Sequence, residues 1–363
     1  MGGYAARFTE VGMADVGAVG GKGASLGELT RAGVAVPPGF VVTTAGFGEA
    51  MAVVDPIERQ RGRIARLDPD DLTAVTQVTG ELRRRIGYLP VPDPVRRTVS
   101  AHYRSLSASE RSSEASDAAG VAAGAVAVRS SATGEDSADA SYAGLQDTYL
   151  WVRGEEPVLY HLRRCWASLY SVESVCYRRR HGLSESKLAM AVVVQQMVDP
   201  RCAGVMFTRS PLTGDRSVVA VEATWGLGSA LVGGDVTPDR FVVNKVTGEV
   251  VTRAVSRKLR QHLPDPAGTG ICERDVPPSR VDACCLTDAE LGELVRVAKR
   301  IEAHYRAPQD IEWALVGDQV YVLQSRPETV WARRDAAAVP VAPARPRALD
   351  HVIDVLGGRA AWG

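Results

Sequence analysis

Four polar side chains near the end of the sequence have the types and spacing of a site for a divalent cation and phosphate. Asp310, Glu312, Gln324 and Arg326 lie in two alternating runs on either side of Gly317-Asp318-Gln319, and this pattern predicts a β-hairpin with a short turn. With the middle residue of the turn as its centre, Asp310 falls opposite Arg326. Glu312 then falls opposite Gln324, so all four groups share one face. Carboxylate and amide oxygens suit Mg²⁺, and a guanidinium suits phosphate oxygens.

The other face of the same hairpin is apolar and is predicted to pack on the core. It carries Ile311, Trp313, Leu315, Tyr321 and Leu323. The polar face also has a simpler interpretation, a surface hairpin with an Asp–Arg cross-strand pair, and such pairs contribute little stability. Since polar clusters are often structural, both interpretations stay open from these residues alone.

A lysine in a glycine-rich run is a candidate phosphate ligand. Lys22 lies within Gly20–Gly23, ahead of a helix predicted over residues 24–32, where free N–H groups and the helix dipole favour anions. The run is not a P-loop, because that motif requires glycine at position 16 and Ser or Thr at position 23, and the chain has Val16 and Gly23. A capping loop with a solvated lysine is the alternative.

A second basic candidate ends a predicted strand. Arg129 closes the strand expected over residues 125–129 and leads into the hydroxyl-rich segment Ser130–Ser137, whose backbone could close over phosphates. A surface loop after a strand is an equally good interpretation. Glu222, followed by Gly226-Leu227-Gly228, is a weaker third signal.

Composition excludes several classes of function. The 363 residues contain 43 Lys and Arg against 43 Asp and Glu, so no net charge favours nucleic acid or an anionic membrane. No apolar run reaches membrane-spanning length, and the N-terminus lacks a signal-peptide pattern. The six cysteines show no metal-ligand spacing, which favours reduced thiols and a cytoplasmic location.

The elements that must position these residues alternate between helices and strands, which predicts an α/β or α+β fold of two lobes. We expect one lobe over residues 1–190, with a flexible loop at 107–124 that is rich in Ser, Ala, Gly and Glu. A second lobe is expected over 191–330, with a helix that begins at a capping box of Thr287 and Glu290 and runs to about Tyr305. A tail over 331–363 would end in a short helix.

Several longer motifs, in order, resemble the pyruvate/phosphoenolpyruvate-binding domain family. This is the ATP-grasp module of phosphoenolpyruvate synthase, pyruvate phosphate dikinase and rifampin phosphotransferase. The resemblance runs from about Val19 to Thr329. Its motifs are Gly20–Leu29, Val34–Thr44, Val128–Asp136, Asp139–Tyr149, Val192–Val198, Gly204–Thr208, Val236–Arg240 and Gln309–Pro327.

The resemblance implies an ATP-grasp fold with the nucleotide bound between its lobes. In that family's pattern, Lys22 and Arg129 would bind the ATP phosphates. Gly144 and Thr148 would lie in the loop that covers them, and Gln195 would contact the adenine side. ATP is therefore the implied cofactor.

The resemblance assigns Mg²⁺ to the hairpin. Glu312 and Gln324 would ligate the ion with help from Asp310, and Arg326 would stabilise charge on the transferred phosphoryl group. The implied catalytic residues are Lys22, Arg129 and Arg326.

The implied function is ATP-dependent phosphotransfer by a stand-alone ATP-binding subunit. The sequence has no TxGGxxSH-like phosphohistidine motif, so we expect transfer of the β-phosphoryl to a histidine on a separate protein, with AMP and phosphate as products. That partner would then phosphorylate pyruvate or another small acceptor. No nucleic-acid or membrane partner is expected.

Two alternatives remain open. The first is a self-contained ATP-grasp kinase or ligase that acts directly on a small molecule, such as one of specialised metabolism. It would fit three departures from the family's usual residues, at Ser210, Ser229 and Arg306. The second is a non-catalytic nucleotide-binding protein, against which the joint presence of a metal site and three phosphate-directed cations argues.

Overall fold

Two β-sheets organise the chain, whose computed structural model describes residues 3–111, 121–133, 136–137, 140–141, 147–185, 188–329, 331 and 334. Residues 1–328 form one compact unit, and residues 329–363 form another. The larger unit holds helices and strands in alternation, so the predicted mixed fold is confirmed. The expected tail helix lies outside the described residues. Among the described helices, none is long and apolar enough to span a membrane.

The first sheet has five strands in the order β1-β2-β7-β3-β6, and all of its neighbours are antiparallel. Its central strand β7 is buried along its whole length, including Gln195 and Gln196. The strand bounds are β1 Ala5–Arg7, β2 Gly39–Val42, β3 Val121–Ala132, β6 Thr148–Arg153 and β7 Met190–Val198.

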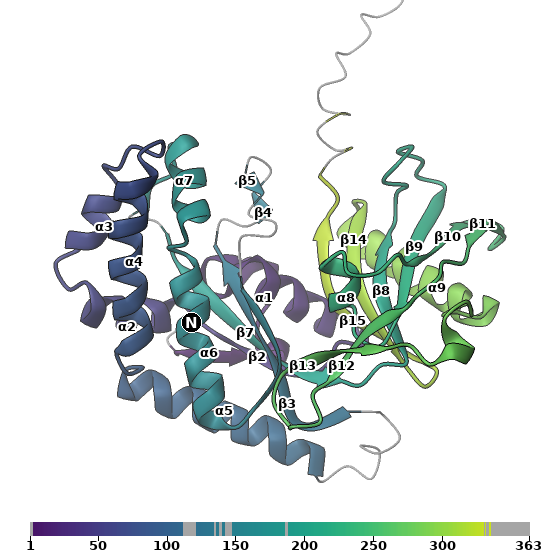
Figure 1. Cartoon of the computed structure of the whole chain (residues 1–363), viewed down its shortest axis with the longest axis horizontal. Helices are drawn as coiled ribbons and strands as arrows, with labels where there is room; N and C mark the ends of the chain where they lie inside the picture. Colours follow the sequence, from purple (N-terminus) through teal and green to yellow (C-terminus); the bar gives the residue numbers. More distant parts are fainter. Residues whose placement is uncertain are drawn as a thin grey trace, which may run out of the picture. The chain divides into compact units, whose positions relative to one another are not determined.

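Helices pack on both faces of this sheet (Figure 1). One face carries Val126, Val128 and Val192, which pack with α2, α4, α5, α6 and α7, and the other carries Val41 and Val193, which pack on α1. The bounds are α1 Val16–Arg31, α2 Thr44–Val54, α3 Arg59–Ile64, α4 Leu72–Tyr88, α5 Asp93–Arg111, α6 Glu155–Ser168 and α7 Val172–Arg180. Short helices η1 and η2 span Phe8–Glu10 and Met13–Asp15.

The second sheet has six antiparallel strands in the order β11-β10-β9-β8-β14-β15. One face packs on α9, whose capping box at Thr287 and Glu290 was predicted from the sequence and is present. The bounds are β8 Cys202–Phe207, β9 Val218–Trp225, α8 Ser229–Val232, β10 Asp239–Asn244, β11 Val250–Ala254, η4 Pro278–Arg280, α9 Asp288–Tyr305, β14 Gln309–Val316 and β15 Gln319–Pro327.

Two small hairpins complete the described elements. The first pairs β4 Asp136–Ser137 with β5 Ala140–Ser141. The second pairs β12 Arg260–Pro264 with β13 Ile271–Asp275 and lies beside α8 and β9. It contributes to the site described below.

The helix α1 joins the two sheets. The Ser25 hydroxyl donates to the carbonyl of Ser325 on β15 at 2.8 Å. Leu29 is fully buried in the core that packs between α9 and the second sheet. Since Val19, Ala24 and Leu26 pack on the first sheet, one helix contributes side chains to both cores.

Two of the predicted boundaries need correction. The loop expected at 107–124 is wrong at both ends, because α5 continues to Arg111 and β3 begins at Val121; residues 112–120 lie outside the described part. The lobe boundary expected after residue 190 falls within β7, which pairs with β2 and β3 of the first sheet. We therefore propose that the boundary between the lobes follows Val198.

The predicted hairpin is present, but its turn is one residue shorter than expected. Val316 pairs with Gln319 around Gly317-Asp318, and Trp313 pairs with Val322. A β-bulge between Glu312 and Trp313 then shifts the register by one residue.

The bulge has opposite consequences for the two ends of the hairpin. On the turn side, Val320 and Val322 face the core in place of the predicted Tyr321 and Leu323, which contact Ala314 and its neighbours on the other face. Beyond the bulge, the predicted pairs Asp310–Arg326 and Glu312–Gln324 are observed. The polar face is therefore confirmed in its pairing, and the apolar prediction for β15 is wrong.

Candidate functional site

Arg129 of β3 connects the first sheet to the β14–β15 hairpin. Its Nη2 donates to Oε1 of Gln324 at 2.6 Å and to Oε2 of Glu312 at 2.8 Å. Its Nη1 donates to the carbonyl of Leu323 at 2.9 Å. The guanidinium is 9% exposed, and pairing of this kind is what permits a buried arginine.

The bulge explains why the Leu323 carbonyl can accept this bond. A bulged residue is left out of the strand ladder, so its backbone groups need other partners. Leu323 lies between the paired residues Val322 and Gln324 and has no partner on β14. Arg129 thus satisfies the Leu323 carbonyl. In the regular hairpin predicted from the sequence, this carbonyl would not be left free by a bulge.

The oxygens around Arg129 form a set of donors suited to a divalent cation. The side-chain oxygens of Glu312 and Gln324 converge on a single guanidinium nitrogen, so a positive charge already lies between them. Hard cations such as Mg²⁺ prefer carboxylate and amide oxygens and complete their shell with phosphate and water. The described residues contain no cluster of three or more His, Cys, Asp or Glu side chains that could hold a metal. A cation here would therefore need oxygens from a bound phosphate or from water to complete its shell.

Asp310 and Arg326 form the next pair along the hairpin. The guanidinium of Arg326 contacts Oδ2 of Asp310 through Nε at 2.8 Å and Nη2 at 2.7 Å. Burial raises the pKa of the Asp310 carboxyl above its ordinary value, although the charge of Arg326 acts in the opposite direction. Arg326 is 44% exposed, so it can reach a group outside the hairpin.

A cavity of about 530 Å³ adjoins the Arg129 cluster, within the size range of small-molecule sites. Arg129 and Glu312 lie at its wall together with apolar side chains from both sheets and from the β12–β13 hairpin. The apolar contributors include Ala127, Met197, Leu227, Ile271 and Leu323.

The cavity brings together two more of the predicted residues. Thr148 of β6 lies opposite Arg129 on β3 and lines the cavity. Gln195 also lines it; the side chain is almost fully buried, and its Nε2 has no hydrogen-bond partner among the described residues. Because a buried unpaired amide is costly, this nitrogen is suited to an acceptor on a bound ligand such as a purine base.

The glycine-rich run with Lys22 forms a kink in α1. Gly20 adopts φ 69° and ψ 173°, a region essentially restricted to glycine, and the helix resumes at Gly21. The Ser131 hydroxyl bridges the kink, since it donates to the carbonyl of Val19 at 2.9 Å and accepts from the N–H of Gly23 at 3.2 Å. Lys22 is therefore placed close to the end of β3, although it does not line the cavity.

We expect Gly20→Ala to destabilise the protein by roughly 2–5 kcal/mol, from backbone strain and overpacking. A Cβ at position 20 would lie 2.1 Å from the Ser131 carbonyl oxygen. The free energy of unfolding in urea measures this effect. Gly17→Ala is the matched control, since its Cβ would meet nothing within 4 Å. Equal stability of the two variants would contradict this account of the kink.

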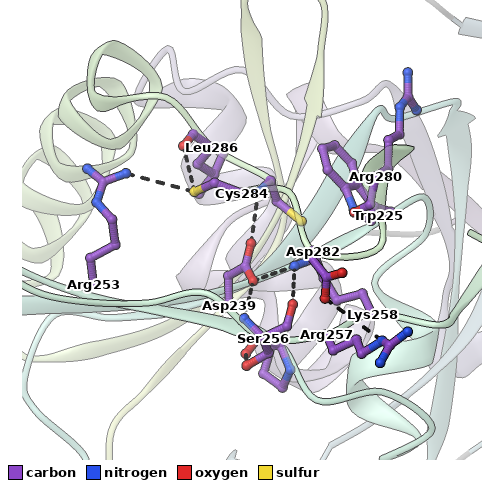
Figure 2. Close-up of polar contacts among 12 residues, drawn as sticks. Trp225, Asp239, Arg253, Ser256, Arg257, Lys258, Arg280, Asp282, Cys284 and Leu286 are labelled. Atoms are coloured by element: carbon purple, nitrogen blue, oxygen red, sulfur yellow. Dashed lines mark hydrogen bonds and ion pairs between the residues drawn. The ribbon is translucent and has the colours of Figure 1, made fainter. Parts of the chain in front are cut away.

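The β12–β13 hairpin is anchored by a buried ion pair (Figure 2). Lys258 precedes β12, and its Nζ lies 2.5 Å from Oδ1 of Asp239, with both side chains fully buried. Oδ1 also accepts from the N–H of Ser256, and Oδ2 accepts from the N–H of Cys285. The tip of the hairpin is held by the N–H of Gly270, which donates to the carbonyl of Trp151 on β6 at 3.0 Å.

Lys258→Met should destabilise the protein by about 3–5 kcal/mol, because it leaves Asp239 charged and unpaired in the interior. The adjacent Arg257→Met is the control. Arg257 pairs with Asp282 at 3.8 Å, and both side chains are more than 70% exposed, so its loss should change stability by no more than about 0.5 kcal/mol. Urea denaturation of both variants tests this, and similar losses would contradict it.

Of the nine predicted site residues, Gly144 lies outside the described part of the chain. The structure directly joins Arg129, Glu312 and Gln324, and it places Thr148 and Gln195 at the same cavity. The pair Asp310–Arg326 flanks this group, and Lys22 precedes Gly23, whose N–H donates to the Ser131 hydroxyl. Sequence reasoning missed the Leu323 carbonyl and the β12–β13 wall, since bulges and hairpin packing leave no local signal.

Comparisons with known proteins identify the family and several relatives of this chain. Residues 16–345 match the family model described as pyruvate phosphate dikinase, AMP/ATP-binding domain. The chain is 41% identical over 328 residues to a probable phosphoenolpyruvate synthase of Methanothermobacter thermautotrophicus, a match covering 90% of this chain and 46% of that protein.

Two rifampicin phosphotransferases are also similar. That of Streptomyces sviceus is 43% identical over 327 residues, or 90% of this chain and 36% of the relative. That of Bacillus cereus is 36% identical over 331 residues, or 91% of this chain and 36% of the relative. The chain thus spans less than half the length of these curated relatives.

Proposed function

Because this chain belongs to the pyruvate phosphate dikinase AMP/ATP-binding domain family, as its motifs predicted, we propose that it is an ATP-dependent phosphotransferase. ATP would bind in the cavity beside Arg129, with its base toward Gln195 and its phosphates toward the β14–β15 hairpin. The single observation that carries this proposal is the convergence of Glu312 and Gln324 on Arg129, where Arg129 and Glu312 line a cavity of about 530 Å³.

The residues present fit both ATP and Mg²⁺. Glu312 and Gln324 would hold the ion, and Asp310 would assist them through the adjacent strand position. When bound, Mg²⁺ neutralises charge on the phosphate oxygens. The same two side chains accept hydrogen bonds from Arg129 in this structure, so a cation held there would share their oxygens with the guanidinium or replace it. Beside the ion, the guanidinium would be suited to bind phosphate oxygens.

The remaining basic residues have separate tasks in this proposal. Lys22 approaches from the kinked helix α1 and would contact the phosphates. Arg326, at the outer end of the hairpin and 44% exposed, would stabilise charge on the phosphoryl group during transfer. Positioning and charge neutralisation account for most of the catalysis of phosphoryl transfer, so no nucleophile from this chain is needed.

We propose that the phosphoryl group passes to a histidine on another domain or protein, with AMP and phosphate as products. The named relatives, phosphoenolpyruvate synthases and rifampicin phosphotransferases, support a family of ATP-using transferases with different final acceptors. Pyruvate or another small molecule would be the final acceptor.

Phosphorus NMR of the purified chain with Mg·ATP tests the proposal, alone and with a histidine-bearing domain of a relative. AMP and phosphate, appearing with that domain, support transfer of the β-phosphoryl group. ADP as the product would support the alternative, a self-contained kinase or ligase. Binding of Mg·ATP without turnover under every pairing would contradict the proposal and indicate a nucleotide-binding protein.

A further inference from the structure

Of the three positions where this sequence departs from the family's usual residues, only Ser229 lies at the cavity. The Ser210 hydroxyl accepts from the N–H of Thr213 and stabilises a local turn. Arg306 ends α9 with φ 54°, which explains why glycine is usual there. The first two therefore have local structural roles, and the departure at Ser229 faces the ligand.

Ser229 is part of a chain of three polar side chains. Its hydroxyl lies 2.9 Å from Nδ1 of His262 on β12. Nε2 of the same ring lies 3.7 Å from Oδ2 of Asp235. The His262 side chain is 16% exposed, and its backbone carbonyl accepts from the N–H of Leu227 at 3.0 Å. The imidazole is thus held by a hydrogen bond at Nδ1 and by its backbone, and a carboxylate lies 3.7 Å from Nε2.

This arrangement determines what Ser229 can offer to a ligand. A neutral imidazole carries its proton on one nitrogen, and the carboxylate of Asp235 favours the proton on Nε2. Nδ1 is then an acceptor, so the Ser229 hydroxyl donates its only proton to it. The serine oxygen therefore presents only lone pairs to the cavity, and it is suited to a ligand group that donates a hydrogen bond.

The position of Ser229 distinguishes the parts of a nucleotide. A Cβ on the preceding Gly228 would lie 3.6 Å from Cβ of Ala203 and 3.9 Å from the backbone nitrogen of Gly204. The next residue of β8, Val205, pairs with Glu312. Adjacent residues of a strand are about 3.4 Å apart, so only a few residues' length of strand separates Ser229 from Glu312 and the proposed metal site. In a nucleotide whose phosphates bind at that site, the group at this distance is the sugar.

We propose that Ser229, oriented by His262, accepts a hydrogen bond from a ribose hydroxyl of the bound nucleotide and makes the site selective for ribonucleotides. This inference rests on the proposed function, because it assumes that ATP occupies the cavity. It assigns a specificity role to two residues that take no part in the chemistry.

Isothermal titration calorimetry of the whole chain with ATP, 2′-deoxy-ATP and 3′-deoxy-ATP tests the inference. We expect at least one deoxy analogue to bind roughly 3- to 10-fold more weakly than ATP, as for one hydrogen bond between uncharged groups. Ser229→Ala should weaken the binding of ATP by the same factor and leave the affinity for that analogue unchanged. Ser217→Ala, in an exposed turn, is the matched control and should change neither.

Variants of His262 test its orienting role. His262→Leu removes the acceptor and should abolish the discrimination between ATP and the deoxy analogue. His262→Asn keeps an oxygen near the position of Nδ1 and should restore part of it. If His262 acted through packing alone, the leucine variant would retain more of the discrimination between ATP and the deoxy analogue than the asparagine variant. That result would overturn the inference for this residue.

Three other outcomes would overturn the inference. Equal affinities for ATP and both deoxy analogues would show that Ser229 does not contact a ribose hydroxyl, and the proposed function would be unaffected. A loss that Ser229→Ala imposes equally on all three ligands would indicate a structural role. If ATP bound more tightly than inosine triphosphate and this preference required Ser229, the result would show that Ser229 contacts the base instead of the sugar. No binding of any nucleotide would contradict the proposed function itself.

Discussion

Arg129→Met is expected to lower ATP-dependent phosphotransfer by at least about 10³-fold, the effect of removing an arginine that stabilises transferring phosphoryl groups. Arg129 also makes three hydrogen bonds to the β14–β15 hairpin. Their loss should weaken the connection between the sheets by about 1–3 kcal/mol. Arg129→Lys keeps a charge but cannot make the same forked contacts, so it should recover little activity. Release of AMP from Mg·ATP, measured beside urea denaturation, separates the two effects.

The exposed pair of Arg104 and Glu155 offers a matched control. Arg104 donates to Glu155 at 3.0 Å on the surface of the first sheet's helices, with the same residue types as Arg129 and Glu312. Arg104→Met should leave turnover unchanged and alter stability by no more than about 0.5 kcal/mol. If Arg129→Met kept its activity within about tenfold of the unaltered chain, the role of Arg129 in phosphate binding would be wrong.

Glu312→Gln is expected to lower phosphotransfer by roughly 10²–10³-fold, as for loss of one group that stabilises transition-state charge, and to raise the Mg²⁺ concentration needed for half-maximal activity. An amide oxygen can still accept from Arg129, but it lacks the charge that a hard cation requires. Because the lost carboxylate also pairs with the buried Arg129, stability in the absence of Mg²⁺ should fall by about 1–3 kcal/mol.

The Mg²⁺ dependence is the decisive measurement for Glu312. An activity loss that excess Mg²⁺ partly reverses supports a ligand role, because mass action compensates for weaker binding. Glu155→Gln is the isosteric control and should leave both activity and Mg²⁺ dependence unchanged. A Glu312→Gln variant with unaltered Mg²⁺ dependence would show that the ion binds elsewhere.

The sequence was sufficient to predict the features that rest on local rules. The capping box at Thr287 and Glu290 and the glycine stop of α1 near Gly33 follow from short-range hydrogen bonding. The alternating runs of the β14–β15 hairpin likewise predicted which polar residues share a face. The family was recognisable because long motifs recur in order.

The hairpin also shows where local rules end. A symmetric turn predicted that Tyr321 and Leu323 face the core, whereas Val320 and Val322 do so. The polar pairs were nevertheless predicted correctly, because the bulge after Glu312 restores the expected register. A bulge depends on whether a neighbouring group can form a hydrogen bond with the backbone of the extra residue. Here that group is Arg129 from another sheet, which donates to the carbonyl of Leu323.

The sequence by itself determined the family, the mixed fold and the presence of residue types suited to phosphate and a divalent cation, because these depend on spacing along the chain. Only the tertiary structure decided that Arg129 pairs with Glu312 and Gln324, 183 and 195 residues further along. It also decided that Ser229 faces the cavity beside His262. Such contacts arise from packing between sheets, which no local pattern of residues encodes.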